Sequence, residues 1–481
     1  MEEIINAVNG LIWSNALIVL CLGAGLYFSL RTRFMQVRGF TEMIRLIKAG
    51  DSSQAGVSSF QALAISLSGR VGIGNIAGVA AAIFYGGPGA VFWMWAVAFL
   101  GASTAYIEST LGQIYKEVDD SGQYRGGPAY YIEKGTGQRW YAWIFAVATI
   151  VATGFLLPGV QAKGIADGMF HAWGIDPRVT AAAVVVLLGM IIFGGVKRIA
   201  SFAQFVVPFM ALAYVLVALT VMVLDYQRLP DMFMLILRNA FGMDAGFGGM
   251  LGLAIAWGVK RGVYSNEAGQ GTGPHAAAAA EVSHPAKQGY VQAFSVYVDT
   301  LLVCSATAFM ILSTGMYNVQ SPGSEALIFE ALPGVEVGAG FTQHAVESVL
   351  PGYGAAFVAL ALLFFAFTTI LAYYYMAETN IAYINRKAHK PWMVFVLRVA
   401  ILVAVILGTM RSAGAAWTLG DIGVGLMAWL NLVAILILQK PALVALKDYE
   451  AQKKAGKDPE FDPDALGIKN ASFWQQRKRQ E

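Results

Sequence analysis

Charged side chains are scarce in this sequence: Asp, Glu, Lys and Arg make up 13% of its 481 residues, about half the share found in soluble domains. Apolar residues make up 57% of the chain and the mean hydropathy is +0.58. This composition excludes an ordinary soluble domain and indicates a polytopic protein of the lipid bilayer. The net charge of +3 indicates no particular partner by itself, and we expect no nucleic acid among the partners.

Residues that carry covalent or metal chemistry are also few. The two cysteines, Cys21 and Cys304, both lie in apolar segments, where a buried thiol is expected rather than a disulfide or a metal site. The five histidines show no ligand spacing and no H-E-x-x-H motif is present. No Ser/His/Asp or paired-carboxylate pattern stands out. We therefore expect no enzyme and no cofactor, and we see no signal peptide at the N-terminus.

Long apolar runs are abundant instead. A membrane span needs about 20 apolar residues, and this criterion predicts an all-α membrane protein with eleven transmembrane helices. They lie near residues 11–30, 60–84, 89–115, 140–164, 179–195, 200–224, 248–276, 287–314, 353–384, 391–411 and 417–439. We expect one transmembrane domain over 1–439 and a solvated cytoplasmic tail over 440–481.

The basic residues of the loops predict how the chain is oriented, because Lys and Arg concentrate on the cytoplasmic side. Every odd-numbered loop is basic, whereas the long even loop at about 315–352 holds four Glu and no Lys or Arg. The pattern predicts a plasma membrane protein of the bacterial inner-membrane type, with its N-terminus outside and its C-terminus in the cytoplasm. The odd loops hold Arg31, Arg33, Arg38, Arg45, Lys48, Lys116, Arg125, Lys134, Arg139, Lys197, Arg198, Lys287, Arg386, Lys387 and Lys390.

Two of the apolar segments contain residues that a spanning helix normally avoids. Residues 68–78 read SGRVGIGNIAG, and residues 262–274 read GVYSNEAGQGTGP. Lipid offers no partner to a freed backbone group, so a break is tolerated only where it is buried in protein or lines a wet cavity. Two interrupted helices at matching places in two halves of a chain indicate the binding site of a transporter.

The layout also predicts an internal repeat. If the span at 11–30 is set aside as an extra helix, residues 60–224 and 248–439 form two groups of five spans. An odd number of spans inverts the second group relative to the first, and each group begins with a broken helix. We therefore predict a five-plus-five inverted repeat, inferred from layout because residue identity between the halves is poor.

At such breaks the N-terminal end of a half-helix suits a carboxylate, and free carbonyls suit Na⁺. The alternative for Gly72, Gly74 and Gly78 is close helix packing. Asn75 and Asn266 could contact a substrate or satisfy loose backbone. The side chain of Gln161 could be a ligand or could join two helices.

Several polar groups at membrane depth are further candidates, because such groups are usually functional or paired. Thr368 and Thr369 could complete an oxygen shell for a hard cation or bond their own helix. Arg70 and Glu267 could form a gate or neutralise one another. The ionisable candidates are Arg70, Glu108, Lys260, Arg261, Glu267, Asp299, Glu378 and Asp421.

The sequence resembles the alanine or glycine:cation symporter family, the sodium:alanine symporters. The matching blocks are GRVGIGNIAGVAAAI (69–83), GGPGAVFWMW (86–95), GGPAYYI (126–132), GVKRGVYSNEAGQGTGPHAAAAAEVSHPAKQG (258–289), VQAFSVYVDT (291–300) and WLNLVAILIL (429–438). The resemblance implies a LeuT-type fold and the symport of alanine or glycine with Na⁺ by alternating access.

The resemblance also implies roles for particular residues. The main chain of 71–75, which includes Gly72, Ile73, Gly74 and Asn75, would hold the substrate carboxylate. Gln161, Asn266, Gly269 and Tyr373 would line the substrate site. The sodium ligands would be the carbonyls of Ser68, Val71 and Phe365 and the hydroxyls of Thr368 and Thr369.

One residue departs from the family pattern, because many members have threonine where this chain has Ile73. The missing hydroxyl leaves the contact at that position open and could alter the choice among alanine, glycine and serine. Two alternatives to sodium symport also stay open. One is proton-coupled uptake through Glu108, Glu267 or Asp299, and the other is an amino-acid sensor that does not transport.

Overall fold

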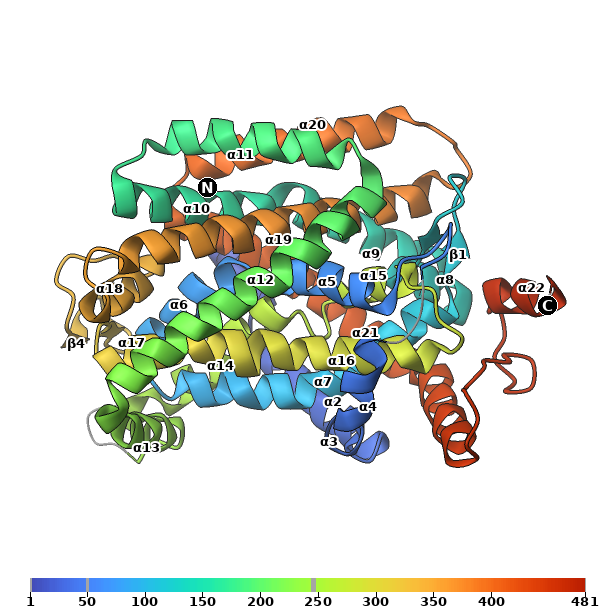
Figure 1. Ribbon diagram of the computed structural model, residues 1–481, viewed down its shortest axis with the longest axis horizontal. Helices are drawn as coiled ribbons and strands as arrows, with labels where there is room; N and C mark the ends of the chain where they lie inside the picture. The colour runs from blue at the N-terminus through green and yellow to red at the C-terminus, as the bar shows by residue number, and fades with distance from the viewer. Residues whose placement is uncertain (1, 49–51, 244–247, 481) are drawn as a thin grey trace.

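The structure is a computed structural model that describes residues 2–48, 52–243 and 248–480. Most of it is helical, and the long helices run roughly along the long axis of the molecule (Figure 1). Two short antiparallel hairpins lie at opposite ends: β1 pairs Glu117 with Arg125 of β2, and β3 pairs Val319 with Phe329 of β4. We call the end with the C-terminal tail the tail end, and the end with β3, β4 and α18 the opposite end.

The helices and strands follow the predicted spans along the chain. The N-terminal part contains α1 (Glu2–Ile12), α2 (Asn15–Arg31), α3 (Met35–Arg38) and α4 (Phe40–Ile47). The first group contains α5 (Ser59–Arg70), a π-helical turn (Gly74–Gly78), α6 (Val79–Gly86), α7 (Ala90–Ile114), β1 (Glu117–Val118), β2 (Tyr124–Arg125), α8 (Pro128–Thr136), α9 (Arg139–Val151), a π-helical turn (Ala152–Leu156), α10 (Leu157–Trp173), α11 (Pro177–Ile192), α12 (Gly195–Leu224), a 3₁₀ turn (Tyr226–Arg228) and α13 (Leu229–Ala240).

The second group is also mostly helical. It contains a 3₁₀ turn (Gly248–Met250), α14 (Leu251–Asn266), α15 (Gly273–Ala279), α16 (Pro285–Val296), a π-helical turn (Tyr297–Cys304), α17 (Ser305–Thr314), β3 (Asn318–Gln320), β4 (Leu327–Glu330), α18 (Ala339–Val349), α19 (Gly354–Asn385), α20 (Trp392–Thr409) and α21 (Ala413–Lys454), and α22 (Ser472–Gln480) follows. Every range predicted to span therefore contains helix.

Among the described residues, eight helices are long and apolar enough to cross a membrane, and one bent pair adds a ninth. That pair, Ser59–Arg70 with Gly74–Gly86, bends by 53°. Helix α11 is a shorter apolar helix, and α14 with α15 is interrupted. The count of eleven and the inverted repeat remain predictions.

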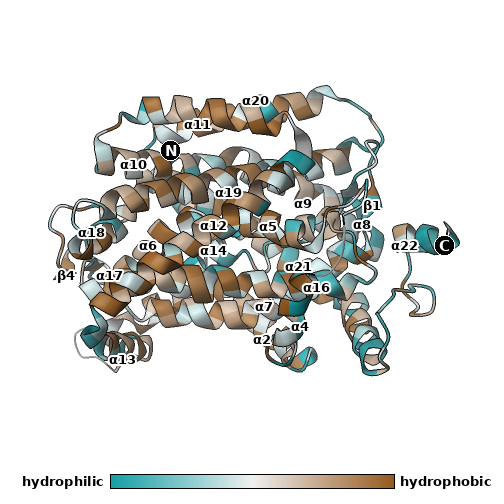
Figure 2. Cartoon of the chain, viewed as in Figure 1, coloured by the Kyte–Doolittle hydropathy of each residue, from teal (hydrophilic) through white to brown (hydrophobic). Residues whose placement is uncertain are grey.

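The surface between the two ends is apolar, as expected of a protein surrounded by lipid. Figure 2 shows apolar residues along the helices and hydrophilic residues gathered toward the ends. On α12, Phe205, Phe209 and Leu212 are exposed by 78%, 69% and 60%. A soluble protein would bury such side chains, so the structure describes an integral multi-pass membrane protein.

The tail differs from its prediction. Helix α21 continues past residue 439 to Lys454, and the residues beyond it fold back onto the molecule. Phe461 and Trp474 are buried. Part of the segment predicted as a solvated tail at 440–481 therefore packs on the protein through its apolar residues, and its cytoplasmic location remains a prediction.

Candidate functional site

The first predicted break is present between α5 and α6. Helix α5 begins with a capping box in which Ser58 and Gln61 exchange hydrogen bonds, and it ends at Arg70. The chain leaves helical geometry at Val71, with φ −79° and ψ 89°. Gly72 fits there because a Cβ would lie 2.5 Å from the hydroxyl of Thr369 and 2.9 Å from the amide oxygen of Gln161. The glycine is required by these two close neighbours from other helices.

Side-chain amides accept the backbone N–H groups that this break frees. The N–H of Ile73 donates to Oε1 of Gln161 at 3.0 Å, and the N–H of Gly72 donates to Oδ1 of Asn75 at 2.8 Å. Gln161 comes from α10, whereas Asn75 belongs to the break itself. The break thus presents two adjacent N–H donors to oxygen atoms, as a site for a carboxylate requires.

The carbonyl oxygens freed by the same break meet α19. The Thr369 hydroxyl lies 2.8 Å from the Ser68 carbonyl oxygen, 3.3 Å from that of Val71 and 3.0 Å from that of Phe365. One hydroxyl proton can satisfy only one of these three acceptors at a time. Because the Ser68 and Val71 oxygens lie at the C-terminal end of α5, the helix dipole adds negative potential there. This oxygen cluster fits a hard cation such as Na⁺.

Thr368 is placed differently from its neighbour. Its hydroxyl lies 3.0 Å and 2.9 Å from the carbonyl oxygens of Phe364 and Phe365 in its own helix. This is the local bonding that a helical threonine usually makes. Four of the five predicted sodium ligands therefore meet around Thr369, and Thr368 joins them only through the shared Phe365 carbonyl.

The second predicted break is also present. Helix α14 ends at Asn266, α15 begins at Gly273, and Glu267, Gly269 and Gly271 have positive φ. The carboxylate of Glu108 on α7 accepts the N–H groups of Gly269 at 3.2 Å and Gly271 at 3.1 Å. The N–H of the predicted substrate residue Gly269 is therefore held by the protein itself. The sequence marked Glu108 as a candidate, but its role as a cap depends on tertiary contact.

The two breaks are joined by a buried polar network. The Asn75 amide donates to Oδ1 of Asp299 at 2.6 Å, and the Ser265 hydroxyl donates to the same oxygen at 3.1 Å. Gly74 packs against the second break, since a Cβ there would lie 3.1 Å from the Tyr264 ring and 3.3 Å from Cα of Ser265. Asn75 thus links the breaks through Asp299.

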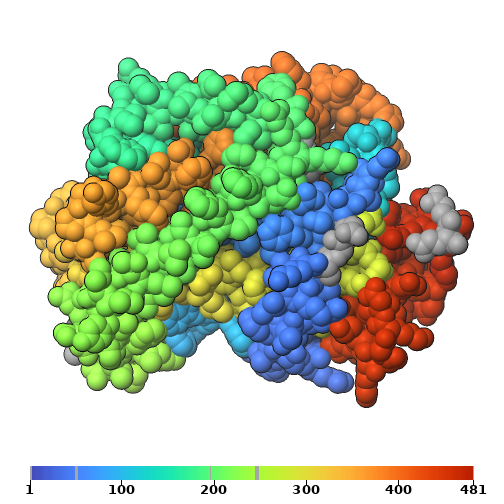
Figure 3. All heavy atoms as spheres, in the orientation of Figure 1, coloured from blue at the N-terminus to red at the C-terminus, as the bar shows by residue number. Residues whose placement is uncertain are grey.

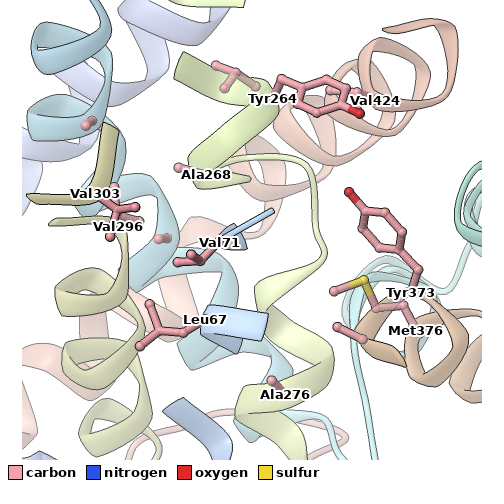
Figure 4. Close-up of a cluster of buried hydrophobic side chains, with 14 of the residues drawn as sticks. Leu67, Val71, Tyr264, Ala268, Ala276, Val296, Val303, Tyr373, Met376 and Val424 are labelled. Carbon is pink, nitrogen blue, oxygen red and sulfur yellow. The ribbon is translucent and has the colours of Figure 1, made fainter. Parts of the chain in front are cut away.

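The remaining predicted residues surround the same region. Tyr373 lies close to Gln161, and Figure 4 shows Tyr264 and Tyr373 on one side of Val71, with Val296 and Val303 on the other. The Asn266 amide oxygen accepts from the N–H of Ala268 at 3.0 Å. Among the described residues, the Asn266 amide nitrogen and the Tyr264 hydroxyl are buried without a partner. These two atoms are available to a ligand, and the sequence analysis did not single out Tyr264.

The side chain of Ile73 packs against Gly164 of α10. It occupies the position that a Cβ on Gly164 would need, and Ile73 is only 3% exposed. The residue that departs from the family pattern therefore packs against a neighbouring helix. Its backbone N–H still faces Gln161.

Arg70 and Glu267 make no direct hydrogen bond or ion pair, but their charges attract one another across the space between the breaks. Arg70 donates to the Gln292 carbonyl at 3.0 Å and to the Ser295 hydroxyl, while Glu267 accepts from the Thr272 hydroxyl at 2.9 Å. The hydrogen bonds of Arg70 thus go to α16, whereas Glu267 bonds within the second break.

A cleft of about 660 Å³ reaches toward the breaks from the opposite end. Its lining includes Arg261, Trp417 and Asp421. Arg261 donates to both carboxylate oxygens of Asp421, at 2.9 Å and 2.8 Å, and its guanidinium lies over the Trp417 ring at 4.5 Å. Trp417 in turn packs on Tyr264, with ring centroids 5.0 Å apart. A charged pair and two aromatic rings therefore separate the cleft from the breaks.

Two interrupted helices that meet at mid-molecule, beside an oxygen cluster and below a cleft that enters from one end, define a secondary transporter of the membrane. The solved structure of MhsT in complex with L-phenylalanine is similar in fold, with a TM-score of 0.54 at 14% identity over 82% of this chain and 98% of that chain. That likeness concerns the fold alone.

The sequence matches the sodium:alanine symporter family over residues 1–463, and the chain belongs to that family. It is 61% identical, over 100% of this chain and 99% of the relative, to the putative sodium/proton-dependent alanine carrier protein YrbD of Bacillus subtilis. It is 55% identical, over 90% of this chain and 97% of the relative, to the sodium/proton-dependent alanine carrier protein of Bacillus sp. PS3. The protein is thus a transporter and not an enzyme.

Proposed function

We propose that this protein couples the entry of Na⁺ to the uptake of a small neutral amino acid, alanine first and glycine second. The observation that carries the proposal is the first break, which offers N–H donors on one side and carbonyl acceptors on the other. A zwitterion and a cation need both kinds of group in one place. The names of the relatives and of the family support alanine and a cation.

In this proposal the substrate carboxylate takes the N–H groups of Gly72 and Ile73. The amide oxygen of Gln161 now accepts from Ile73, so it marks where a carboxylate oxygen would lie. When the substrate arrives, Gln161 turns and its NH₂ group donates to the same carboxylate. The rings of Tyr264 and Tyr373 border the space beside the carboxylate. This space suits a methyl side chain better than a large one.

The cation is held by the carbonyls of Ser68, Val71 and Phe365 with the hydroxyl of Thr369. Because the Val71 carbonyl and the Gly72 N–H belong to the same peptide unit, a bound cation orders the main chain that binds the amino acid. Binding of one ligand then favours binding of the other, which is the coupling that symport needs. We place the tail end in the cytoplasm. The membrane potential then drives Na⁺ inward with about 2.3 kcal/mol per charge for each 100 mV.

A proton is the second candidate for the coupling ion, because Asp299 is a fully buried carboxylate between the two breaks. Uptake of radiolabelled alanine and glycine into proteoliposomes tests both candidates. Alanine uptake driven by an inward sodium gradient at equal pH supports the proposal. Uptake that ignores sodium and follows a pH gradient would replace sodium by the proton, and failure to take up either amino acid under any gradient would exclude the function.

A further inference from the structure

The segment that follows α21 folds across the tail end and contacts both groups of helices. Figure 3 shows this C-terminal segment packed against that end of the molecule. Trp474 of α22 is 3% exposed, and Phe461 is 7% exposed. Such burial is unusual for a charged terminal segment, and it gives these residues a defined docking surface.

On the side of the first group, the segment docks at the end of α7. The indole N–H of Trp474 donates to the Gln113 carbonyl oxygen at 2.9 Å. The buried Lys116 ammonium lies 4.5 Å from the centre of the Phe473 ring and 5.3 Å from that of Trp474. These contacts combine a hydrogen bond with cation–π attraction, which gains strength away from water.

On the side of the second group, the same segment holds the loop between α15 and α16. Arg477 pairs with Glu281 at 2.7 Å and donates to the Val282 carbonyl at 3.2 Å. The N–H of Phe461 donates to the Ser283 carbonyl at 3.1 Å. The segment therefore bridges the two groups.

That loop is also where the two interrupted helices are joined at this end. The N–H of Val57, just before α5, donates to the Ala279 carbonyl at 2.9 Å, and the N–H of Glu281 donates to the Val57 carbonyl at 2.8 Å. Lys116 adds a hydrogen bond to the Ala280 carbonyl at 2.9 Å. The residues that lead into α5 and those that follow α15 are thus hydrogen-bonded to each other beneath the C-terminal segment.

We propose that residues 456–480 are a latch that keeps the tail end of the transporter closed, and that release of the latch favours opening at this end. Access from the tail end requires α5 to move away from the loop at 279–281. The latch grips that loop through Arg477 and the neighbouring α7 through Trp474, so it stabilises the closed arrangement. This inference rests on the alternating access of the proposed function and adds its regulation.

A cysteine reporter at the start of α5 tests the latch. Ser59 is 2% exposed at the wall of a pocket of about 710 Å³ and accepts a hydrogen bond from Gln288, so Ser59→Cys is nearly isosteric and its labelling should become faster when α5 moves. The rate of labelling by a maleimide is measured on the full-length protein in detergent, with the protein that lacks the reporter as the blank. The native cysteines Cys21 and Cys304, which both proteins retain, are buried.

Trp474→Ala and Arg477→Ala should each speed the labelling, by about fivefold or more for the tryptophan, which is the low end of measured couplings between sites. Arg479→Ala is the matched control, because it removes the same charge from an exposed position of the same helix. Equal labelling rates in all four proteins would overturn the latch. If Trp474→Ala fails to fold, Arg477→Ala decides, since its side chain is 33% exposed.

Sodium-dependent binding of radiolabelled alanine is measured in the same preparations. Binding in the parent with unchanged labelling in the variants rejects the latch and leaves the proposed function in place. Absence of alanine binding in the folded parent rejects the proposed function instead, whatever the labelling rates are.

Discussion

The two interrupted helices meet at the centre of the molecule, yet their main-chain groups are satisfied in different ways. At the first break, groups of α5 face side chains from α10 and α19, and three carbonyls share the hydroxyl of Thr369. At the second break, Glu108 caps two N–H groups and the Asn431 amide donates to the Gly269 carbonyl at 3.0 Å. At the first break several main-chain carbonyls thus share one hydroxyl, whereas these main-chain groups of the second break have side-chain partners of their own.

This difference assigns different roles to the two breaks. A ligand gains most where polar groups are shared or available, so the first break is where the cation and the carboxylate bind in our proposal. The second break forms one side of the substrate site and has a fixed bend. Its Asn266 amide nitrogen and Tyr264 hydroxyl are buried without a partner among the described residues and can bond to a ligand. Substitutions at the two breaks should therefore fail in different ways.

The largest effect is expected from Gly72→Ala, which places a methyl group 2.5 Å from the Thr369 hydroxyl and 2.9 Å from the Gln161 amide oxygen. It should abolish both sodium and alanine binding while leaving the protein in the membrane. Gly78→Ala is the control, because its nearest neighbour would be the Trp417 ring at 3.7 Å. Uptake assays that show normal transport by Gly72→Ala would make the first break a packing feature only.

Thr369→Ala comes next, since it removes the one side-chain oxygen that meets all three carbonyls. The loss of a hydrogen-bonding group to a charged partner costs about 1.5–3 kcal/mol, which corresponds to roughly a ten- to hundredfold higher sodium concentration for half-maximal uptake. Thr368→Ala should shift this concentration much less, because its hydroxyl bonds its own helix. Equal shifts in the two variants would contradict the placement of the cation.

Gln161→Ala should act on the amino acid rather than on the ion. Loss of one neutral hydrogen bond costs about 1 kcal/mol, so we expect alanine binding to weaken by about fivefold at saturating sodium. Isothermal titration with alanine measures this effect. A larger change in the sodium requirement than in alanine affinity would remove Gln161 from the substrate site.

The smallest effect on ligand binding is expected from Glu108→Gln at the second break. The glutamine retains one acceptor oxygen, but its NH₂ group faces one of the backbone N–H groups that the carboxylate accepts. The unpaired N–H costs about 1–3 kcal/mol in stability. We expect a lower midpoint of thermal unfolding and an unchanged sodium requirement for binding. A shifted sodium requirement at normal stability would show that the second break takes part in ion binding.

The sequence predicted what depends on local chain chemistry. Glycines with polar residues inside an apolar run indicated both breaks, because an ordinary spanning helix avoids such residues and a break is tolerated only where it is buried in protein or lines a cavity. The family resemblance brought Ser68, Val71, Phe365 and Thr369 into one expected group, and the structure places them together. The ligand roles of these residues remain predictions.

The features that escaped prediction depend on contacts between distant segments. The cap of Glu108 on the second break joins residues about 160 positions apart, and the pairing of Arg261 with Asp421 joins α14 to α21. Composition marked each charge as costly at membrane depth but could not select its partner. The docked tail was missed because a charged segment with few apolar residues looks solvated until its surface is known.

The most direct test of the central claim is an experimental structure determined with alanine and sodium present. We predict a cation bound by the carbonyls of Ser68, Val71 and Phe365 with the Thr369 hydroxyl, and an alanine carboxylate on the N–H groups of Gly72 and Ile73. A cation bound only at Asp299, with the Ile73 N–H still held by Gln161, would contradict the account.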